Sequence, residues 1–238
     1  MTATAPPLSR PQTARTILPM AALAAVVVGF AGGWRGGETL SDGAGMRSVL
    51  GLAFGHFRDG GLPYWLDEIW GGTPAWALGP SFTLTWMFPL AQVLGPEGAV
   101  KYGGLAAQVA GAWGAFVFAR SLWGGTAAPL LAGLIYGLSP MAIGHAALYG
   151  IEPVIWVIAA VPWFAWTFRN ALVHPGLRWP VASGAIATFA LLQQAEYAYP
   201  YAILGLAFVV VEVNRRRARG GEGMGPMLGR AAAATLIA

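Results

Sequence analysis

Few residues of this chain can act as acids, bases or ligands, since only 10 of its 238 residues are Asp or Glu and 3 are His. Asp42 lies shortly after an apolar stretch, 17–34, that is long enough to cross a membrane. A carboxylate held just outside a membrane can act as a general base on an acceptor hydroxyl. Ser41 or Asp42 can also be the N-cap of a following helix. Both interpretations of Asp42 stay open, because a cap and a base can coincide.

Asp67 and Glu68 are adjacent carboxylates in a segment rich in Trp and Tyr. They could bind a divalent cation or orient a sugar, or they could be solvated loop charges. Two neighbouring carboxylates are a weak metal signature, so a divalent cation is compatible with the sequence but not indicated by it, and the cofactor stays unknown. The sequence contains no P-loop, no dinucleotide fingerprint after a strand, no His-Glu-x-x-His and no Gly-x-Ser-x-Gly, so ATP-driven transport and common hydrolase chemistry lack support.

The remaining candidates flank later apolar stretches. His145 and Glu152 lie on either side of Tyr149, where they could contact a phosphate or a sugar or could be ordinary interfacial residues. Glu196 belongs to a polar and aromatic segment, 193–200, that is either a hairpin loop or a kinked helix lining a cavity. Ionisable residues close to a membrane are costly, so each is a candidate for substrate binding.

The composition decides which kind of fold must position these residues. Hydrophobic residues make up 56% of the chain and charged residues only 10%, with a mean hydropathy of +0.58, whereas a soluble domain carries about 25% charged residues. The sequence therefore predicts an all-α, polytopic transmembrane helix bundle in the cell membrane. The net charge of +4 comes from arginines in short loops, which indicates membrane topology and no nucleic-acid partner. Without cysteine, neither a disulfide nor a thiolate metal site can form.

The chain divides into a cytoplasmic tail at 1–16, a transmembrane module at 17–213 and a cytoplasmic basic loop with the start of a further helix at 214–238. The expected apolar segments are 17–34, 80–96, 101–119, 126–144, 151–168, 179–193 and 198–213. The first segment also fits a cleaved signal peptide, but the spans that follow favour a retained helix. Because the last residues resemble the opening of another helix, we expect the N-terminal portion of a longer protein.

A long first outer loop, 35–77, separates the first two apolar segments. Within it, apolar residues recur at three- and four-residue spacing over 46–57, which predicts an amphipathic helix on the membrane surface. The arginines at 215–219 should be cytoplasmic, as should Arg10 and Arg15. We interpret the cluster at 215–219 as a topology anchor that can also contact anionic membrane lipid, so membrane lipid is an expected partner. Seven full crossings would put these two groups on opposite faces. Segment 80–96, which contains Pro80, Pro89 and Pro96, is therefore expected to be a re-entrant or broken helix.

Three motifs in and after this loop resemble those of the YfhO-like membrane proteins, which belong to the GT-C superfamily of polytopic glycosyltransferases. They are Gly-Gly-Leu-Pro-Tyr-Trp at 60–65, Gly-Gly-Thr-Pro at 71–74 and Phe-Pro-Leu at 88–90, preceded by Asp42 after the first helix. In architecture, the run of apolar segments to about residue 213 is also similar to the N-terminal module of this family.

The resemblance implies transfer of a sugar from a polyprenyl-phosphate carrier to an acceptor on the non-cytoplasmic face. By this resemblance, Asp42 matches the position of the catalytic acidic residue in the first loop. Its carboxylate would deprotonate the acceptor there. Asp67 stands where many relatives have Asn-Pro, so the resemblance gives it no role, and the later helices of the family are missing. A transporter or lipid flippase, or a non-catalytic membrane assembly subunit, is the alternative. The carboxylates concentrate in one outer loop, which favours surface chemistry over transport.

Overall fold

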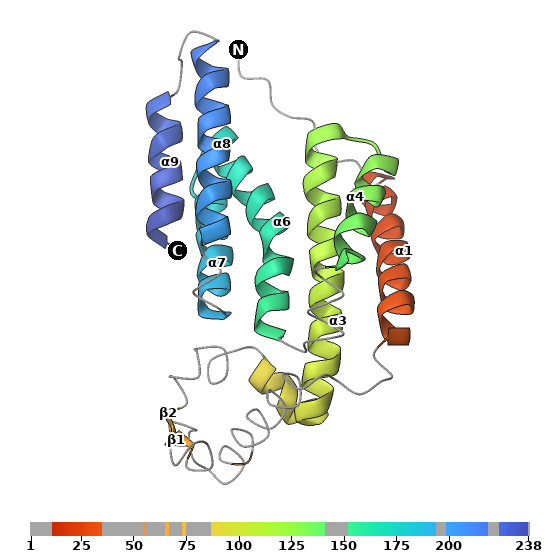
Figure 1. Ribbon diagram of the computed structural model, residues 1–238. Coiled ribbons are helices and arrows are strands. Elements are labelled where there is room, and N and C mark those ends of the chain that lie inside the picture. Colours follow the sequence, from red (N-terminus) through yellow and green to blue (C-terminus); the bar gives the residue numbers. More distant parts are fainter. Residues whose placement is uncertain are drawn as a thin grey trace.

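The computed structural model describes residues 11–34, 55, 65–66, 73–74, 87–140, 152–193, 199–218 and 224–237. Its helices are α1 (Pro11–Trp34), α3 (Met87–Trp123), α4 (Ala127–Gly137), α6 (Glu152–Val173), α7 (Arg178–Gln193), α8 (Tyr199–Arg217) and α9 (Met224–Ile237). Strands β1 (Trp65–Leu66) and β2 (Thr73–Pro74) form one short antiparallel pair. The all-α class is thus confirmed for the described residues (Figure 1). Of the predicted surface helix at 46–57, only Gly55 is described, and it is helical.

Hydrogen bonds between helices fix the direction in which each helix runs. Arg120 donates to Thr16 Oγ1 at 2.7 Å and the Trp113 indole to the Met20 carbonyl at 2.8 Å, so α1 and α3 are antiparallel. The Trp163 indole donates to the Ala110 carbonyl at 2.8 Å, and Arg169 contacts Ser121 farther along both helices. Therefore α3 and α6 run parallel.

The C-terminal helices pack against α6 on its other side (Figure 1). The Tyr201 hydroxyl donates to the Val157 carbonyl and Arg216 to the Leu172 carbonyl, so α8 runs parallel to α6. Helix α9 begins beside the end of α6 and finishes beside α7, where Thr188 donates to the Ile237 carbonyl at 3.0 Å. The result is a bundle with two distinct ends.

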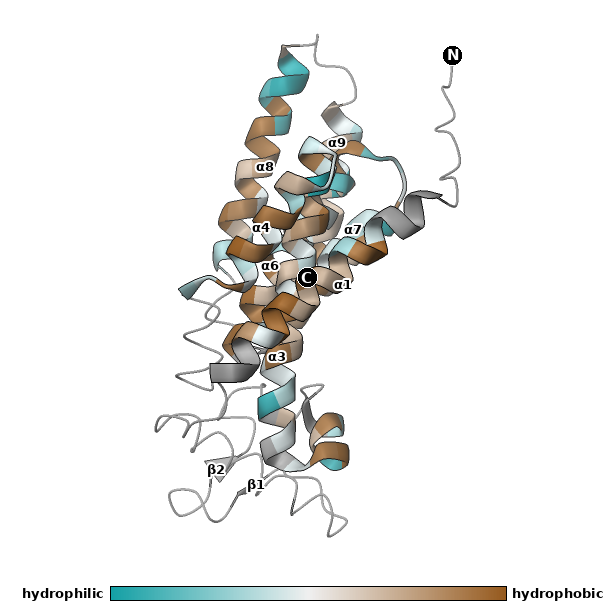
Figure 2. Ribbon diagram, turned by 90° about the vertical axis from the view of Figure 1, so that its right-hand side faces the viewer, coloured by the Kyte–Doolittle hydropathy of each residue, from teal (hydrophilic) through white to brown (hydrophobic). Residues whose placement is uncertain are grey.

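We call one end the arginine end; it contains Thr16, Arg120, Leu172, Arg216 and Arg230 and lies at the top of Figure 1. We call the other the opposite end. There α1 finishes, α3, α6 and α8 begin, and β1 and β2 lie beyond the helices in both views (Figures 1 and 2). Helix α1 leaves the arginine end, and α3, α6 and α8 each return to it. The start of α1 and the arginines of α8 are therefore on the same side.

This arrangement depends on α3, which joins two segments that the sequence analysis treats as separate, 80–96 and 101–119. In the structure Met87–Trp123 forms one element with a kink at Gly95, whose φ of 72° and ψ of 166° are not helical. Glycine adopts a positive φ without steric cost, and the following Pro96 is well suited to restart a helix. The described part of 80–96 is thus a broken helix rather than a separate span, and the conflict between the two arginine groups disappears.

Small residues allow the helices to approach closely. A Cβ on Gly133 of α4 would lie 2.6 Å from Leu23 Cδ2 and 2.9 Å from the Ala112 carbonyl oxygen, and one on Gly137 would lie 2.8 Å from Ala112 Cβ. A Cβ on Gly114 of α3 would lie 2.8 Å from the Trp163 ring. Glycines spaced four residues apart at close helix contacts are typical of membrane proteins, where packing rather than water exclusion holds helices together.

Apolar side chains also cover much of the outside of the bundle. On α8, Ile203, Leu206 and Val211 are 64%, 65% and 63% exposed, and α4 exposes Leu131 and Ile135 (Figure 2). Soluble monomers rarely expose apolar surface so extensively. Within the described part of the chain, one helical stretch, Lys101–Trp123, is long and apolar enough to cross a membrane by itself, and Thr16–Phe30 and Ala127–Gly137 are shorter apolar helices.

Candidate functional site

Most residues that the sequence analysis singled out lie outside the described part of the chain, namely Asp42, Asp67, Glu68, His145 and Glu196. Glu152 is described only as the first residue of α6. Their roles stay predictions. The described elements that precede or follow them in the chain can, however, be placed.

Most helix and strand ends that flank these residues in the chain lie at the opposite end of the bundle. Asp42 comes between the end of α1 and β1, while Asp67 and Glu68 come between β1 and β2. His145 comes between α4 and the start of α6, and Glu196 between the end of α7 and the start of α8. The structure therefore gathers at one end the end of α1, strands β1 and β2, the start of α6, the end of α7 and the start of α8, whereas α4, which precedes His145, ends beside the middle of α3.

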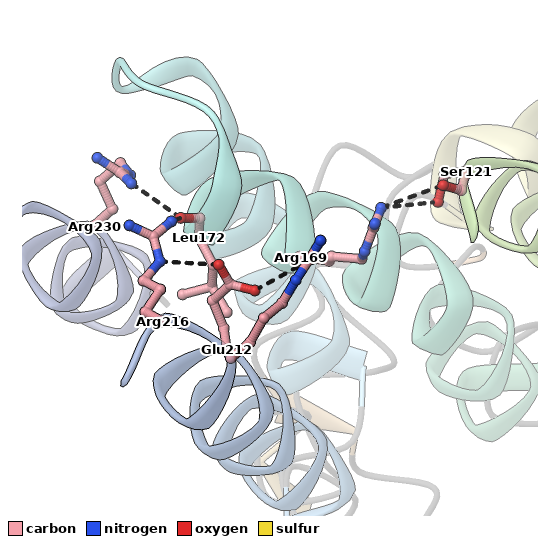
Figure 3. A network of polar contacts seen from close by, with 7 residues as sticks. Ser121, Arg169, Leu172, Glu212, Arg216 and Arg230 are labelled. Atoms are coloured by element: carbon pink, nitrogen blue, oxygen red, sulfur yellow. Dashed lines mark hydrogen bonds and ion pairs between the residues drawn. The ribbon is translucent and has the colours of Figure 1, made fainter. Parts of the chain in front are cut away.

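The arginine end holds the polar network that the described residues form (Figure 3). Arg230 Nε donates to the Ala171 carbonyl at 2.7 Å and its Nη2 to the Leu172 carbonyl at 3.0 Å. Arg216 Nη2 donates to the same Leu172 carbonyl at 3.1 Å. The last carbonyls of a helix have no partner within it and carry partial negative charge, so two guanidinium groups stabilise the end of α6.

Glu212 compensates part of this positive charge. Its Oε1 accepts a hydrogen bond from Arg216 Nε at 2.9 Å, and its Oε2 lies 3.7 Å from Arg215 Nη1. The Glu212 side chain is only 14% exposed. The sequence analysis missed this carboxylate because it included residues up to 213 in an apolar segment. The signal was available, since a Glu followed by Arg three and four residues later marks ion pairs on one helix face.

Arg169 makes a separate and longer contact with α3. Its Nη1 lies 3.5 Å from both the carbonyl and the hydroxyl oxygen of Ser121 (Figure 3). Arginine side chains are donors that stay charged and cannot transfer protons at neutral pH. The arginines at this end can therefore bind anions but cannot act as general bases. Among the described residues, no group of three or more His, Cys, Asp or Glu could hold a metal ion.

A large apolar cavity lies between α6, α7, α8 and α9. Its volume is about 510 Å³. Residues lining it include Phe164, Phe168, Gly205, Leu206, Val209 and Ala231. The two hydroxyl groups in its wall are occupied, because Tyr201 donates to the Val157 carbonyl and Thr235 to the Ala231 carbonyl at 3.0 Å. The cavity surface is thus mostly apolar.

A second cavity, of about 340 Å³, lies between α3, α6 and α7 and is lined by Trp156, Trp163 and Phe189 together with small residues. Its walls offer hardly any polar surface. Neither cavity therefore has the convergent polar groups of an active site.

Comparison with known proteins gives no relative, since no family model, curated protein or solved structure matches the chain.

Proposed function

We propose that the chain is a multi-pass protein of the cell membrane whose arginine end faces the cytoplasm. Two features support this orientation. The helices expose apolar side chains along their outer faces, and the arginines of α8 and α9 lie together at one end. An excess of Arg and Lys at membrane boundaries favours the cytoplasmic side. The opposite end, with β1 and β2, then faces outward.

We further propose that this module belongs to a glycosyltransferase-like protein that uses a polyprenyl-phosphate-linked sugar on the non-cytoplasmic face. The observation that carries the proposal is the common location of most helix and strand ends around Asp42, Asp67, His145, Glu152 and Glu196, opposite the arginines. A surface reaction needs its acid, base and binding groups on one side of the membrane. The motifs at 60–65 and 71–74 give the reaction its class, by their resemblance to the GT-C family.

In this proposal Asp42 is the general base. The acceptor hydroxyl oxygen attacks the anomeric carbon of the sugar and forms the new glycosidic bond. The bond between that carbon and the phosphate oxygen breaks, and the lipid phosphate leaves with its electron pair. The hydroxyl proton passes to the Asp42 carboxylate. A hydroxyl has a pKa far above neutral pH, so a base at this position lowers the barrier by accepting the proton as the bond forms.

The test is Asp42→Asn in the full-length protein, assayed with a polyprenyl-phosphate sugar. Asn retains shape and most of the capping ability, so expression should be unchanged. We expect sugar transfer to fall at least about 100-fold, as is typical when a general base is removed. Asp67→Asn is the matched control. If Asp42→Asn transfers normally while Asp67→Asn abolishes transfer, the base lies in the aromatic loop and our assignment is wrong.

The described helices give less support to a transporter. A transporter places binding groups near the membrane midplane, often in broken helices. Of the four buried polar side chains among the described residues, Gln108, Thr167 and Asn170 each donate to a main-chain carbonyl, whereas the Ser183 hydroxyl and the Gln108 Oε1 atom have no hydrogen-bond partner. The three donors therefore stabilise helices and their contacts rather than line a polar path. If neither aspartate variant affects transfer and no lipid-linked sugar is consumed, transport or an assembly role replaces the enzymatic proposal.

A further inference from the structure

We infer that the apolar cavity between α6, α8 and α9 holds an acyl chain of an anionic phospholipid from the cytoplasmic leaflet. The inference rests on the proposed membrane placement but not on sugar transfer. The charged residues beside the cavity are at the arginine end, away from the predicted reaction, so its ligand is distinct from the sugar donor.

The walls of the cavity select a hydrocarbon chain. Aromatic and aliphatic side chains from α6 and α8 form one side, and alanines of α9 the other. Because the hydroxyls of Tyr201 and Thr235 already donate to carbonyls, a polar ligand in the cavity would lose bonds to water without replacing them there. An alkyl chain loses nothing of this kind.

The arginines next to the cavity favour a ligand with a negative head group. Phe168, which lines the cavity, is one helical turn before Leu172, whose carbonyl binds both Arg216 and Arg230. Arg230 immediately precedes the lining residue Ala231 and is only partly buried. A guanidinium group has five N–H donors, and the two hydrogen bonds from Arg230 to α6 leave others available. Arg230 can therefore also donate to a phosphate oxygen. Arg215, with a side chain 51% exposed, adds positive charge on α8.

The arginines and the cavity therefore match the two parts of a phospholipid. The cations lie where the head group would be, at the membrane boundary, and the apolar walls lie where the acyl chain would be. From Tyr201 to Val209 the lining of α8 extends about 12 Å along the helix axis. This length is comparable to one leaflet of a hydrocarbon core about 30 Å thick. Basic pockets between transmembrane helices on the cytoplasmic side are known to bind anionic lipid head groups.

The experiment is native mass spectrometry of the purified chain in detergent, with equimolar phosphatidylglycerol and phosphatidylcholine carrying identical acyl chains. We expect one phosphatidylglycerol to be retained in preference to phosphatidylcholine. Arg230→Gln should lower the ratio of retained phosphatidylglycerol to phosphatidylcholine about fivefold. This is the effect expected from removing the attraction of one arginine to an anionic lipid. Arg178→Gln is its control, because Arg178 is exposed at the same end but lies over the Trp179 ring, away from the cavity.

A second pair of variants tests the cavity itself, in case Arg230→Gln does not fold. Ala202→Phe with Ala232→Phe places two rings in the cavity from exposed lining positions and should abolish lipid retention. Ala207→Phe with Leu228→Phe, at exposed positions on the same helices outside the lining, should leave it unchanged. Equal binding of both lipids, no retained lipid, or retention by the cavity-filled variant would overturn the inference. So would a two-chain complex that the cavity-filled variant abolishes, because a second copy would then occupy the cavity.

Discussion

At the scale of single residues, Arg230 and Arg216 act on the main chain of another helix rather than on a carboxylate. Both guanidinium groups bind carbonyls at the end of α6, and Glu212 takes up part of their charge. Helix ends in a membrane are costly unless their carbonyls find donors. The arginines of α8 and α9 thus have a structural role in addition to the effect on orientation that we propose for them.

Removing Arg230 tests this role. Arg230→Met keeps much of the side-chain volume but deletes two charge-assisted hydrogen bonds, to Ala171 and Leu172. Because the group is only partly buried, we expect a loss of about 1–2 kcal/mol in the free energy of unfolding, seen as a lower melting temperature in detergent. Arg178→Met, at an exposed site of the same end, should change stability by less than about 0.5 kcal/mol. Equal melting temperatures for the two variants would show that the carbonyl contacts contribute nothing.

Individual residues also show where sequence reasoning stops. Arg216 was predicted to mark the cytoplasmic side, and its bond to the Leu172 carbonyl could not be predicted, because it joins residues far apart in sequence. Glu212 was missed although its spacing to Arg216 carried a local signal. The candidate site is untested for a different reason. Asp42 and its companions lie outside the described residues, so their predicted roles rest on sequence alone.

At the scale of elements, the sequence predicted most helices to within a few residues because long apolar runs bounded by charges are strong local signals. Helix α7, expected at 179–193, occupies Arg178–Gln193. Helix α3 is the main difference, since it unites two expected segments across Gly95. Pro96 suggested a break, but whether a proline ends a helix or follows a kink depends on packing that a local pattern does not contain.

Close packing of α4 against α1 and α3 leads to an element-scale prediction. Gly133→Ala puts a methyl group 2.6 Å from Leu23 Cδ2 and 2.9 Å from the Ala112 carbonyl oxygen, so α4 must move away from its neighbours. We expect destabilisation by about 1–3 kcal/mol, the usual cost of overpacking.

Gly29→Ala in α1 is the matched control, because a Cβ there meets nothing within 4 Å. Alanine is the better helix former, so this variant should be neutral or more stable by about 0.5–1 kcal/mol. Thermal unfolding in detergent compares the two. A Gly133→Ala variant as stable as Gly29→Ala would contradict the close approach of α4 to α1 and α3.

At the scale of the whole molecule, the two ends of the bundle have different chemistry. Arginines bound to helix carbonyls occupy one end, and most of the helix and strand ends next to the predicted acidic and aromatic residues occupy the other. Apolar faces such as those of α4 and α8 lie between them. This polarity is the basis of both proposals, a reaction at the outer surface and an anionic lipid at the cytoplasmic surface.

The orientation of the bundle tests this account most directly, and the absence of native cysteine makes single-cysteine labelling clean. Leu177→Cys lies at the arginine end and Tyr199→Cys at the opposite end, and both positions are exposed, at 68% and 62%. Gly60→Cys adds a position in the predicted outer loop. With a membrane-impermeant maleimide, intact cells should label positions 199 and 60, while position 177 should react only after permeabilisation. Labelling of position 177 in intact cells, with 199 and 60 protected until permeabilisation, would contradict the account.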